Sequence, residues 1–158
     1  TYPFVQTGSA GKSIMEKDIS YVKIGRGPKE VFYSASFHAN EWITSIVLLE
    51  FLYEYSNAIQ NNFTIFGFPA RRLFETTSIY VIPLVNPDGV DLVTGVLPTT
   101  SPSYKQAEKI AYGFATIPFP DGWKANIRGV DLNLQFPAEW EKARQIKYEQ
   151  GFTRSSSS

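Results

Sequence analysis

The sequence predicts an α/β fold built on a mainly parallel or mixed sheet with helices on both of its faces. Two observations predict it. Short segments rich in β-branched and aromatic residues, typical of buried strands, alternate along the chain with longer apolar or amphipathic segments, typical of helices. The chain of 158 residues is also 43% hydrophobic and 15% aromatic, which is enough apolar surface for one domain with a real core.

Composition excludes several kinds of site and partner. The 15 basic and 15 acidic residues cancel, so bulk charge favours neither nucleic acid nor an anionic membrane surface as a partner. The absence of cysteine excludes disulfides, a thiolate nucleophile and cysteine-based zinc sites, and it leaves the compartment open. No apolar run is long enough to span a bilayer. Because the chain starts at Thr1 and not at methionine, we expect an excised fragment.

The first half of the chain predicts a β-hairpin followed by a long helix. Residues 19–25 and 31–37 each have the pattern of a strand, and a turn containing glycine and proline separates them. The apolar segment from residue 42 to about residue 55 predicts a helix, which Asn40 can cap. Residues 1–12 and 152–158 are rich in small polar residues and glycine, and we expect a flexible leader and a flexible tail there.

The second half predicts one interior strand, a turn and three helices. Residues 78–85 are nearly all apolar, as in a strand that is covered on both faces. The tetrapeptide 86–89, of sequence Asn-Pro-Asp-Gly, has the chemistry of a tight turn. The predicted helices are residues 71–74 after Pro69, residues 103–112 with Ser103 as the cap, and residues 138–150.

One strand-to-helix junction carries the residues on which the functional prediction depends. His38 is the only histidine of the chain, and Glu41 lies three positions after it, in the first turn of the predicted helix. A neutral imidazole and a carboxylate fixed by one turn at the end of a sheet can converge on one cation, and Zn²⁺ is the usual occupant of such sites. The alternative is that the spacing arises by chance and that His38 is simply hydrogen-bonded, as most lone histidines are.

Three motifs, taken in this order, resemble the zinc carboxypeptidase family. They are His38-Ala39-Asn40-Glu41-Trp42, Asn86-Pro87-Asp88-Gly89, and Trp123-Lys124-Ala125-Asn126 continuing into Arg128-Gly129-Val130-Asp131-Leu132-Asn133. Within the family they look most like the bacterial γ-D-glutamyl-diamino acid endopeptidases that cut peptidoglycan stem peptides. The joint match is specific, and it corresponds to roughly the first half of the family's catalytic domain.

The resemblance implies a role for each matching residue. His38 and Glu41 look like two of the family's three zinc ligands, in a site where the metal polarises the scissile carbonyl and activates a water molecule. Lys124 takes the place of an arginine that stabilises the oxyanion, and it keeps the charge but loses the bidentate fork. Asn133 matches the asparagine that helps to hold the substrate's terminal carboxylate, and Arg128 of the same motif is expected among the substrate-binding residues.

Two departures from the family pattern modify the prediction. Leu134 replaces the arginine that clamps the substrate's C-terminal carboxylate, so trimming of ordinary C-terminal residues is expected to be disfavoured. The alternative is that Leu134 only packs beneath the last helix. No histidine follows Glu41, so the third zinc ligand cannot come from this chain, and we expect the family's general-base glutamate beyond Ser158. We therefore expect one Zn²⁺ per complete catalytic domain, and an isolated chain that is inactive.

The leading hypothesis is the N-terminal part of a zinc metallopeptidase whose complete form hydrolyses γ-D-glutamyl linkages in bacterial cell-wall peptides. The alternative is a non-catalytic module on the same fold that binds peptide or peptidoglycan through Lys124, Asn133 and the segment 86–89. A phosphate- or nucleotide-binding domain fits less well, because a glycine-rich phosphate loop is missing. The expected partners are a peptide or stem-peptide substrate, no nucleic acid, no membrane, and a second copy through an exposed sheet edge.

Overall fold

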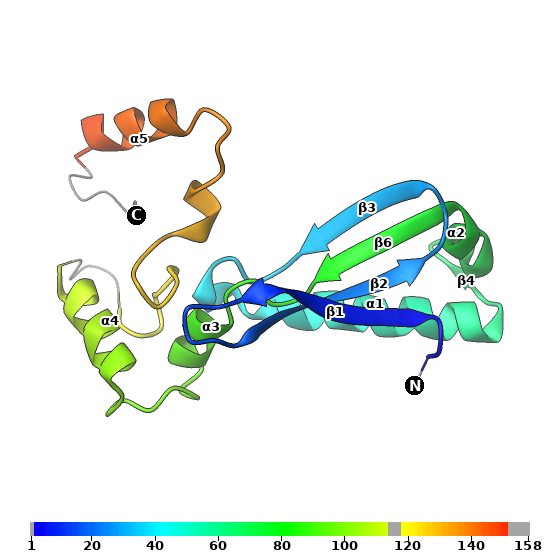
Figure 1. Ribbon diagram of the computed structural model, residues 1–158, viewed down its shortest axis with the longest axis horizontal. Helices are drawn as coiled ribbons and strands as arrows, with labels where there is room; N and C mark the ends of the chain where they lie inside the picture. The colour runs from blue at the N-terminus through cyan, green and yellow to red at the C-terminus, as the bar shows by residue number, and fades with distance from the viewer. Residues whose placement is uncertain (1, 114–117, 152–158) are drawn as a thin grey trace. The chain divides into compact units, whose positions relative to one another are not determined.

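The computed structural model describes residues 2–113 and 118–151 and divides into two compact units. Unit 1 comprises Thr1–Ser36 and Glu41–Pro87, and unit 2 comprises Phe37–Asn40 and Asp88–Ser158. Unit 1 contains the sheet and the long helix α1, whereas unit 2 contains the helices α4 and α5 (Figure 1). The predicted flexible tail, residues 152–158, lies outside the described residues.

Unit 1 is built on a four-stranded mixed sheet with the strand order β1-β2-β6-β3. Strand β2 pairs antiparallel with both β1 and β6, and β3 pairs parallel with β6. The mixed sheet is therefore confirmed. The strands are β1 Val5–Lys12, β2 Asp18–Gly25, β3 Lys29–Ser34 and β6 Thr77–Ile82. Because β3 lies at one edge of this sheet, self-association through that edge stays a prediction.

Two strand predictions for the first half of the chain were wrong. Residues 5–12, expected to belong to a flexible leader, form β1 and pair with β2. Most of their side chains are exposed, so an edge strand of small polar residues carries no apolar signal in the sequence. Residues 19–25 and 31–37 do not form a hairpin with each other, because β6 lies between β2 and β3.

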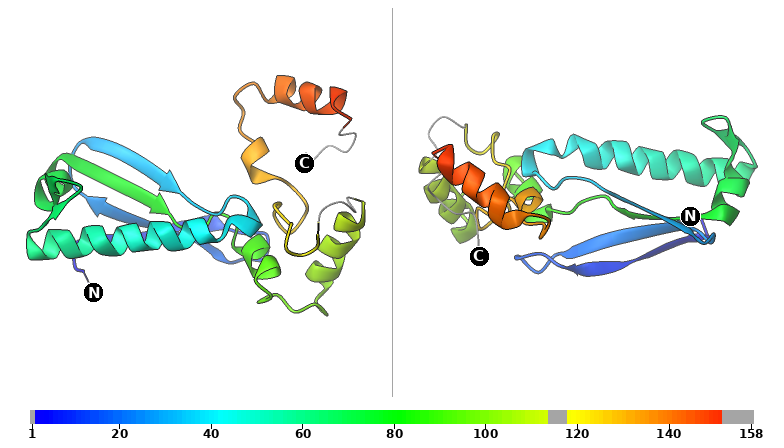
Figure 2. Two further views of the ribbon diagram at one scale, coloured as in Figure 1. Left: turned by 180° about the vertical axis from the view of Figure 1, so that it is seen from behind. Right: turned by 90° about the horizontal axis from the view of Figure 1, so that it is seen from above.

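Helix α1, Ile43–Asn61, lies along one face of the sheet (Figure 2, right). The core between them is formed by buried side chains of α1, the sheet and α2. These are Ile24, Leu52, Tyr55, Ala58, Ile59, Ala70 and Val81. Burial raises the pKa of Tyr55 to about 12, and its hydroxyl has no hydrogen-bond partner within the described part of the chain. Helical cover on the opposite face of the sheet stays a prediction.

The helix starts differ from those predicted. Asn40 lies in the 3-10 helix η1 (Ala39–Glu41) and does not cap α1, which begins after Trp42 without a side-chain cap. The cap of α4 is the hydroxyl of Ser101, which accepts from the amide of Tyr104 at 3.2 Å, and not Ser103. The tetrapeptide 86–89 is not an isolated turn, because α3 begins within it.

The remaining elements are short. The helices are α2 Ala70–Thr76, α3 Pro87–Val93, α4 Pro102–Tyr112, the 3-10 helix η2 Leu132–Leu134 and α5 Trp140–Glu149, and a small hairpin pairs β4 Thr64–Ile65 with β5 Phe68–Pro69. Among the residues that the structure describes, no helix is both long enough and apolar enough to cross a membrane.

The end of β2 requires glycine at position 25. Gly25 has φ +108°, and a Cβ atom there would lie 2.0 Å from the carbonyl oxygen of Thr77 in the neighbouring strand β6. We expect Gly25→Ala to lower the free energy of unfolding by about 3 kcal/mol or more, as measured by urea titration. Gly11→Ala is the control, because Gly11 also has a positive φ (+145°) but nothing within 4 Å of the added Cβ. Equal losses in both variants would contradict the clash.

Candidate functional site

The segment 123–131 is a loop that one asparagine side chain organises. Oδ1 of Asn126 accepts hydrogen bonds from the backbone amides of Arg128 (2.9 Å) and Val130 (3.1 Å). The backbone closes the same loop, since the amide of Asn126 donates to the carbonyl of Val130 at 2.8 Å. Gly129 turns the chain with φ +84°, a conformation that is open to glycine. The local sequence therefore fixes the path of the loop.

A hydrogen bond joins this loop to the sole histidine of the chain. Nε2 of His38 lies 3.2 Å from Oδ1 of Asp131, and the two side chains are 16% and 27% exposed. The backbones are joined as well, because the amide of Ala39 donates to the carbonyl oxygen of Lys124 at 3.0 Å. Within unit 2, residues far apart in the sequence thus meet at the turn that carries His38.

The carboxylate of Asp131 is held by its own neighbours. Its Oδ1 also accepts from the backbone amide of Asn133 at 3.0 Å, which makes Asp131 the cap of η2. Its carbonyl oxygen accepts from Nε2 of Gln135 at 3.1 Å. With the proton of His38 on Nε2 and donated to Asp131, the lone pair lies on Nδ1. A carboxylate that holds the second ring nitrogen in this way is typical of metal-binding histidines.

His38 has the chemistry of one zinc ligand, because it offers an imidazole that a carboxylate holds. The other predicted ligand, Glu41, is the exposed last residue of η1 and belongs to unit 1. Within residues 2–113 and 118–151, no group of three or more His, Cys, Asp or Glu side chains could hold a metal ion. Protein zinc sites use three or four protein ligands, so a complete site needs at least one donor more.

The other predicted site residues are exposed and lie in unit 2. Lys124 and Arg128 belong to the loop just described, and Asn133 and Leu134 belong to η2. The side chain of Leu134 is 43% exposed, so it is not buried beneath the last helix as the alternative requires. The backbone bond at Lys124 and the capping bond at Asn133 bring these two residues toward the turn that carries His38.

The sequence prediction gave no role to Asp131, although its motif includes this residue. Asp131 could have been suggested by a general rule, since a metal-bound histidine usually has a carboxylate hydrogen-bonded to its second ring nitrogen. The structure shows that Asp131 is the carboxylate hydrogen-bonded to His38.

The segment 86–89 is not an exposed recognition loop. Asn86 and Asp88 are each 2% exposed, and the amide of Asn86 donates to the carbonyl of Ser36 at 3.1 Å. Buried side chains cannot present themselves to a peptide, which removes one of the three contacts expected for a non-catalytic binding module.

Comparison with known proteins identifies the family. The family model for zinc carboxypeptidases matches residues 1–157. A relative named gamma-D-glutamyl-L-diamino acid endopeptidase 1, from Lysinibacillus sphaericus, is 44% identical over 140 residues, which cover 89% of this chain and 35% of the relative. The uncharacterized protein YqgT of Bacillus subtilis (strain 168) is 43% identical over 142 residues, which cover 89% of this chain and 37% of that protein. The chain spans about a third of the length of these relatives.

A solved structure agrees at the level of the fold. The crystal structure of thrombin activatable fibrinolysis inhibitor superposes with a TM-score of 0.60 at 20% identity, covering 86% of this chain and 30% of that one. The family model matches nearly the whole sequence, and the motifs found in the sequence lie within the match. The chain belongs to the zinc carboxypeptidase family.

Proposed function

We propose that this chain forms the N-terminal part of the catalytic domain of a zinc-dependent peptidase that hydrolyses γ-D-glutamyl-diamino acid bonds in bacterial cell-wall peptides. The observation that carries the proposal is the 3.2 Å hydrogen bond between Nε2 of His38 and Oδ1 of Asp131, an arrangement that is typical of metal-bound histidines. The 44% identity to a relative named as a γ-D-glutamyl-L-diamino acid endopeptidase supports the substrate class.

Each side chain has one task in this proposal. His38 and Glu41 hold the zinc ion, which when bound polarises the scissile carbonyl and lowers the pKa of a bound water. Asp131 keeps His38 in the tautomer that presents Nδ1. Lys124 supplies a positive charge for the oxyanion of the transition state. Asn133 donates from its side-chain amide to a carboxylate of the substrate.

A chimera tests this function. Residues 13–151 of this chain replace the aligned segment of the Lysinibacillus sphaericus relative, which itself is the positive control. We expect the chimera to cut a synthetic peptide at its γ-D-glutamyl-L-diamino acid bond, to lose that activity with a chelator and to regain it with Zn²⁺. A chimera with the circular dichroism of the control that cuts other peptides but not this bond would contradict the substrate class. One that cuts none would contradict the proposal.

Position 134 is proposed to disfavour ordinary carboxypeptidase activity. The exposed Leu134 offers no cation to a free C-terminal carboxylate, and the exposed guanidinium of Arg128 is the cation proposed to bind acidic groups of the stem peptide instead. We expect Leu134→Arg in the chimera to raise kcat/KM on simple C-terminal dipeptide substrates by at least about tenfold, since a charge-assisted pair is worth about 1.5–3 kcal/mol. Leu134→Met is the control without a charge. An arginine variant that gains no more than the methionine variant would count against this role.

The isolated chain is proposed to retain zinc poorly and to be inactive. Its single histidine and Glu41 make two protein ligands, fewer than protein zinc sites use. We expect atomic absorption on the dialysed 158-residue chain to find well under one zinc per chain, whereas the chimera retains about one. Stoichiometric zinc that resists dialysis in the isolated chain would overturn this expectation.

A non-catalytic peptide-binding module is the second candidate, and the exposed side chains of Lys124 and Asn133, which a peptide can reach, support it. The two candidates differ in what His38 does. If the chain is a binding module, His38→Ala should leave its affinity for a stem peptide unchanged. If it is part of a peptidase, the chimera that carries His38→Ala should no longer hydrolyse that peptide.

A further inference from the structure

A cluster of exposed aromatic rings lies at one end of unit 1. Between α1 and α2 the chain forms the β4–β5 hairpin, where Phe63, Phe66 and Phe68 are 58%, 81% and 60% exposed. These three residues are called the aromatic tip below. Ile65, which lies between them in the sequence, packs against the core of unit 1. Backbone hydrogen bonds of 2.9 and 3.0 Å tie Phe63 to α1 and to the first residue of α2, so the tip is a fixed projection.

The turn of this hairpin holds an aromatic residue that its geometry does not favour. Phe66 has φ +51° and Gly67 has φ +80°, the left-handed pair of a two-residue hairpin turn, for which Asn-Gly is preferred. A bulky residue at positive φ has a strained backbone. Burial of the ring within the chain does not offset that cost, because the ring is 81% exposed. Packing within the described residues therefore gives no reason for a phenylalanine at this position.

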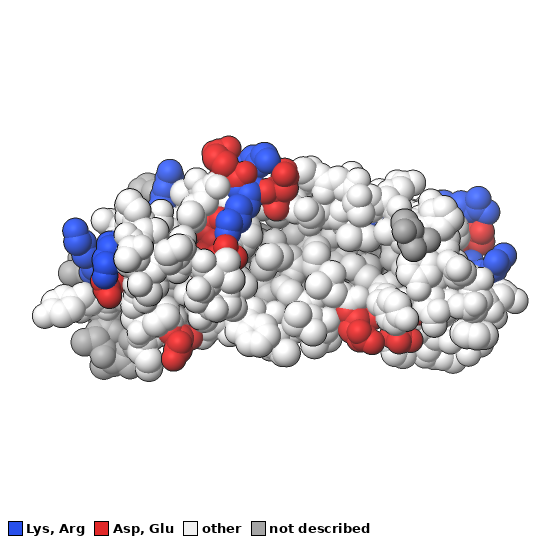
Figure 3. Space-filling model, turned by 90° about the horizontal axis from the view of Figure 1, so that it is seen from below, with Lys and Arg blue, Asp and Glu red and all other residues white. Residues whose placement is uncertain are grey.

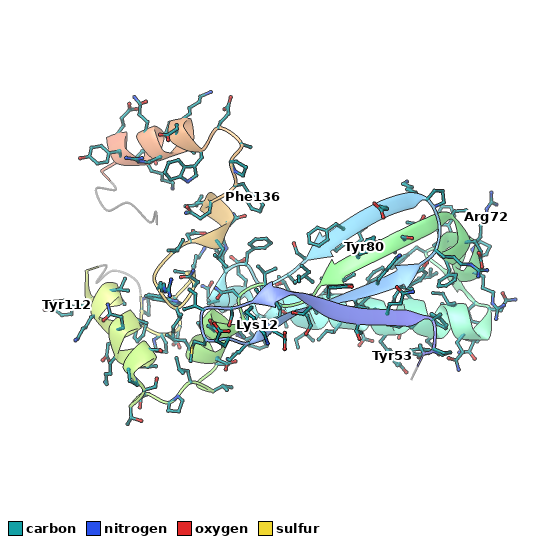
Figure 4. The ribbon with its side chains drawn as sticks, viewed as in Figure 1. Lys12, Tyr53, Arg72, Tyr80, Tyr112 and Phe136 are labelled. Carbon is teal, nitrogen blue, oxygen red and sulfur yellow. The ribbon has the colours of Figure 1, made fainter. Side chains whose placement is uncertain are left out.

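Positive charge accompanies the tip. Arg71 and Arg72, in the first turn of α2, are exposed, and Arg72 forms no ion pair with any residue that the structure describes (Figure 4 labels Arg72 at this end of unit 1). The nearby acid, Glu75, is held by Arg26 through hydrogen bonds of 2.6 and 2.7 Å, and these bonds together with the charges of Arg26 and Arg71 lower the pKa of Glu75. Nε of Arg71 donates to the carbonyl oxygen of Ile59 at 3.3 Å. Figure 3 shows basic side chains at this end of unit 1, with an acidic side chain between them and uncharged surface around them.

We propose that the aromatic tip inserts into the head-group region of an anionic lipid bilayer, with Arg71 and Arg72 facing the lipid phosphates. Aromatic rings favour the membrane–water interface, and surface cations are attracted to anionic lipids. The expectation of no membrane partner was based on the zero net charge of the chain. Salt screens charges beyond about 8 Å, so the attraction to an anionic bilayer depends on the charges near the aromatic tip and not on the net charge of the chain. A second copy fits less well, because a two-fold contact between tips would bring Arg72 beside its equivalent.

Co-sedimentation with vesicles tests the proposal on the 158-residue chain. We expect the chain to bind vesicles of phosphatidylcholine with phosphatidylglycerol more tightly than vesicles of phosphatidylcholine alone, and high salt to remove the difference. Phe66→Asn suits the turn better than phenylalanine and so preserves the fold, yet it should lower the partition coefficient about tenfold or more. Arg72→Gln should lower it about fivefold on anionic vesicles.

The matched control is Tyr112→Asn, which removes a ring that is 88% exposed at the end of α4, in unit 2. Its partition coefficient should equal that of the unchanged chain. A positive signal comes from Phe66→Trp. Because the chain already has three tryptophans, the spectrum of the unchanged chain is subtracted, and the remaining fluorescence should shift to shorter wavelength on anionic vesicles. The proposal would be overturned if the chain failed to bind anionic vesicles or if Phe66→Asn left the binding unchanged. It would also be overturned if sedimentation velocity showed a dimer that Phe66→Asn abolishes, without any lipid binding.

Discussion

Replacing His38 with alanine in the chimera is expected to lower kcat/KM on the γ-D-glutamyl peptide by at least about a thousandfold. The imidazole is the only one that this chain can offer to a metal, and a proposed three-ligand site that loses one ligand does not retain its zinc. The several kcal/mol of charge stabilisation that bound zinc supplies are then lost, and each 1.36 kcal/mol is about a factor of ten in rate. Steady-state kinetics and metal analysis on the same protein samples measure both effects.

The matched variant for this prediction is Asp131→Asn. It keeps the imidazole but replaces the carboxylate that lies 3.2 Å from Nε2, so it should cost about 10–100-fold, as the loss of such a partner typically does. The expected order is therefore unchanged chimera, Asp131→Asn, then His38→Ala, in both zinc content and rate. A His38→Ala chimera that keeps full zinc and full activity would remove His38 from the site.

Replacing Lys124 with alanine is the second large effect that we expect, about 10²–10³ in kcat with the zinc content unchanged. Lys124 is exposed, and its backbone carbonyl is tied to the turn that carries His38, so the side chain starts beside the proposed reaction centre. Loss of one group that stabilises an oxyanion typically has this magnitude, and it falls on kcat because the charge develops in the transition state.

Two variants separate this role from a general loss of positive charge. Lys124→Arg keeps a cation and adds a bidentate fork, so it should retain most of the activity. Lys109→Ala removes another exposed lysine of unit 2, at the end of α4, and should leave kcat unchanged. A Lys124→Ala chimera that changes KM alone would make Lys124 a substrate-binding residue and not a catalytic one.

How far the fold could be predicted depended on the strength of the local apolar signal. The apolar segment after Trp42 predicts a helix, and α1 covers it, although the helix continues to Asn61. The prediction stopped near residue 55 because the next residues look polar. Ser56, Ala58 and Ile59 are nevertheless buried, and packing against the core extends the helix beyond what the local sequence indicates.

Strand pairing could not be predicted in the same way. The side chains of strand β1 are mostly exposed. Strand β6 lies between β2 and β3 in the sheet, although in the sequence it comes after both strands and after the long helix α1. Which strand edges pair is decided by the tertiary structure, and the pattern of side-chain polarity within one strand does not indicate its neighbour.

The sequence by itself determined which donors exist: one histidine, no cysteine, the motif that contains Lys124 and Asn133, and a leucine at position 134. These are matters of composition and order, and they sufficed to indicate the family. The tertiary structure alone decided that Asp131, 93 positions after His38, is the carboxylate on its ring nitrogen, and that three phenylalanines share one exposed tip with two arginines. A hydrogen bond of about 3 Å depends on the path of all the chain between its partners, and that path is set by packing and not by local sequence.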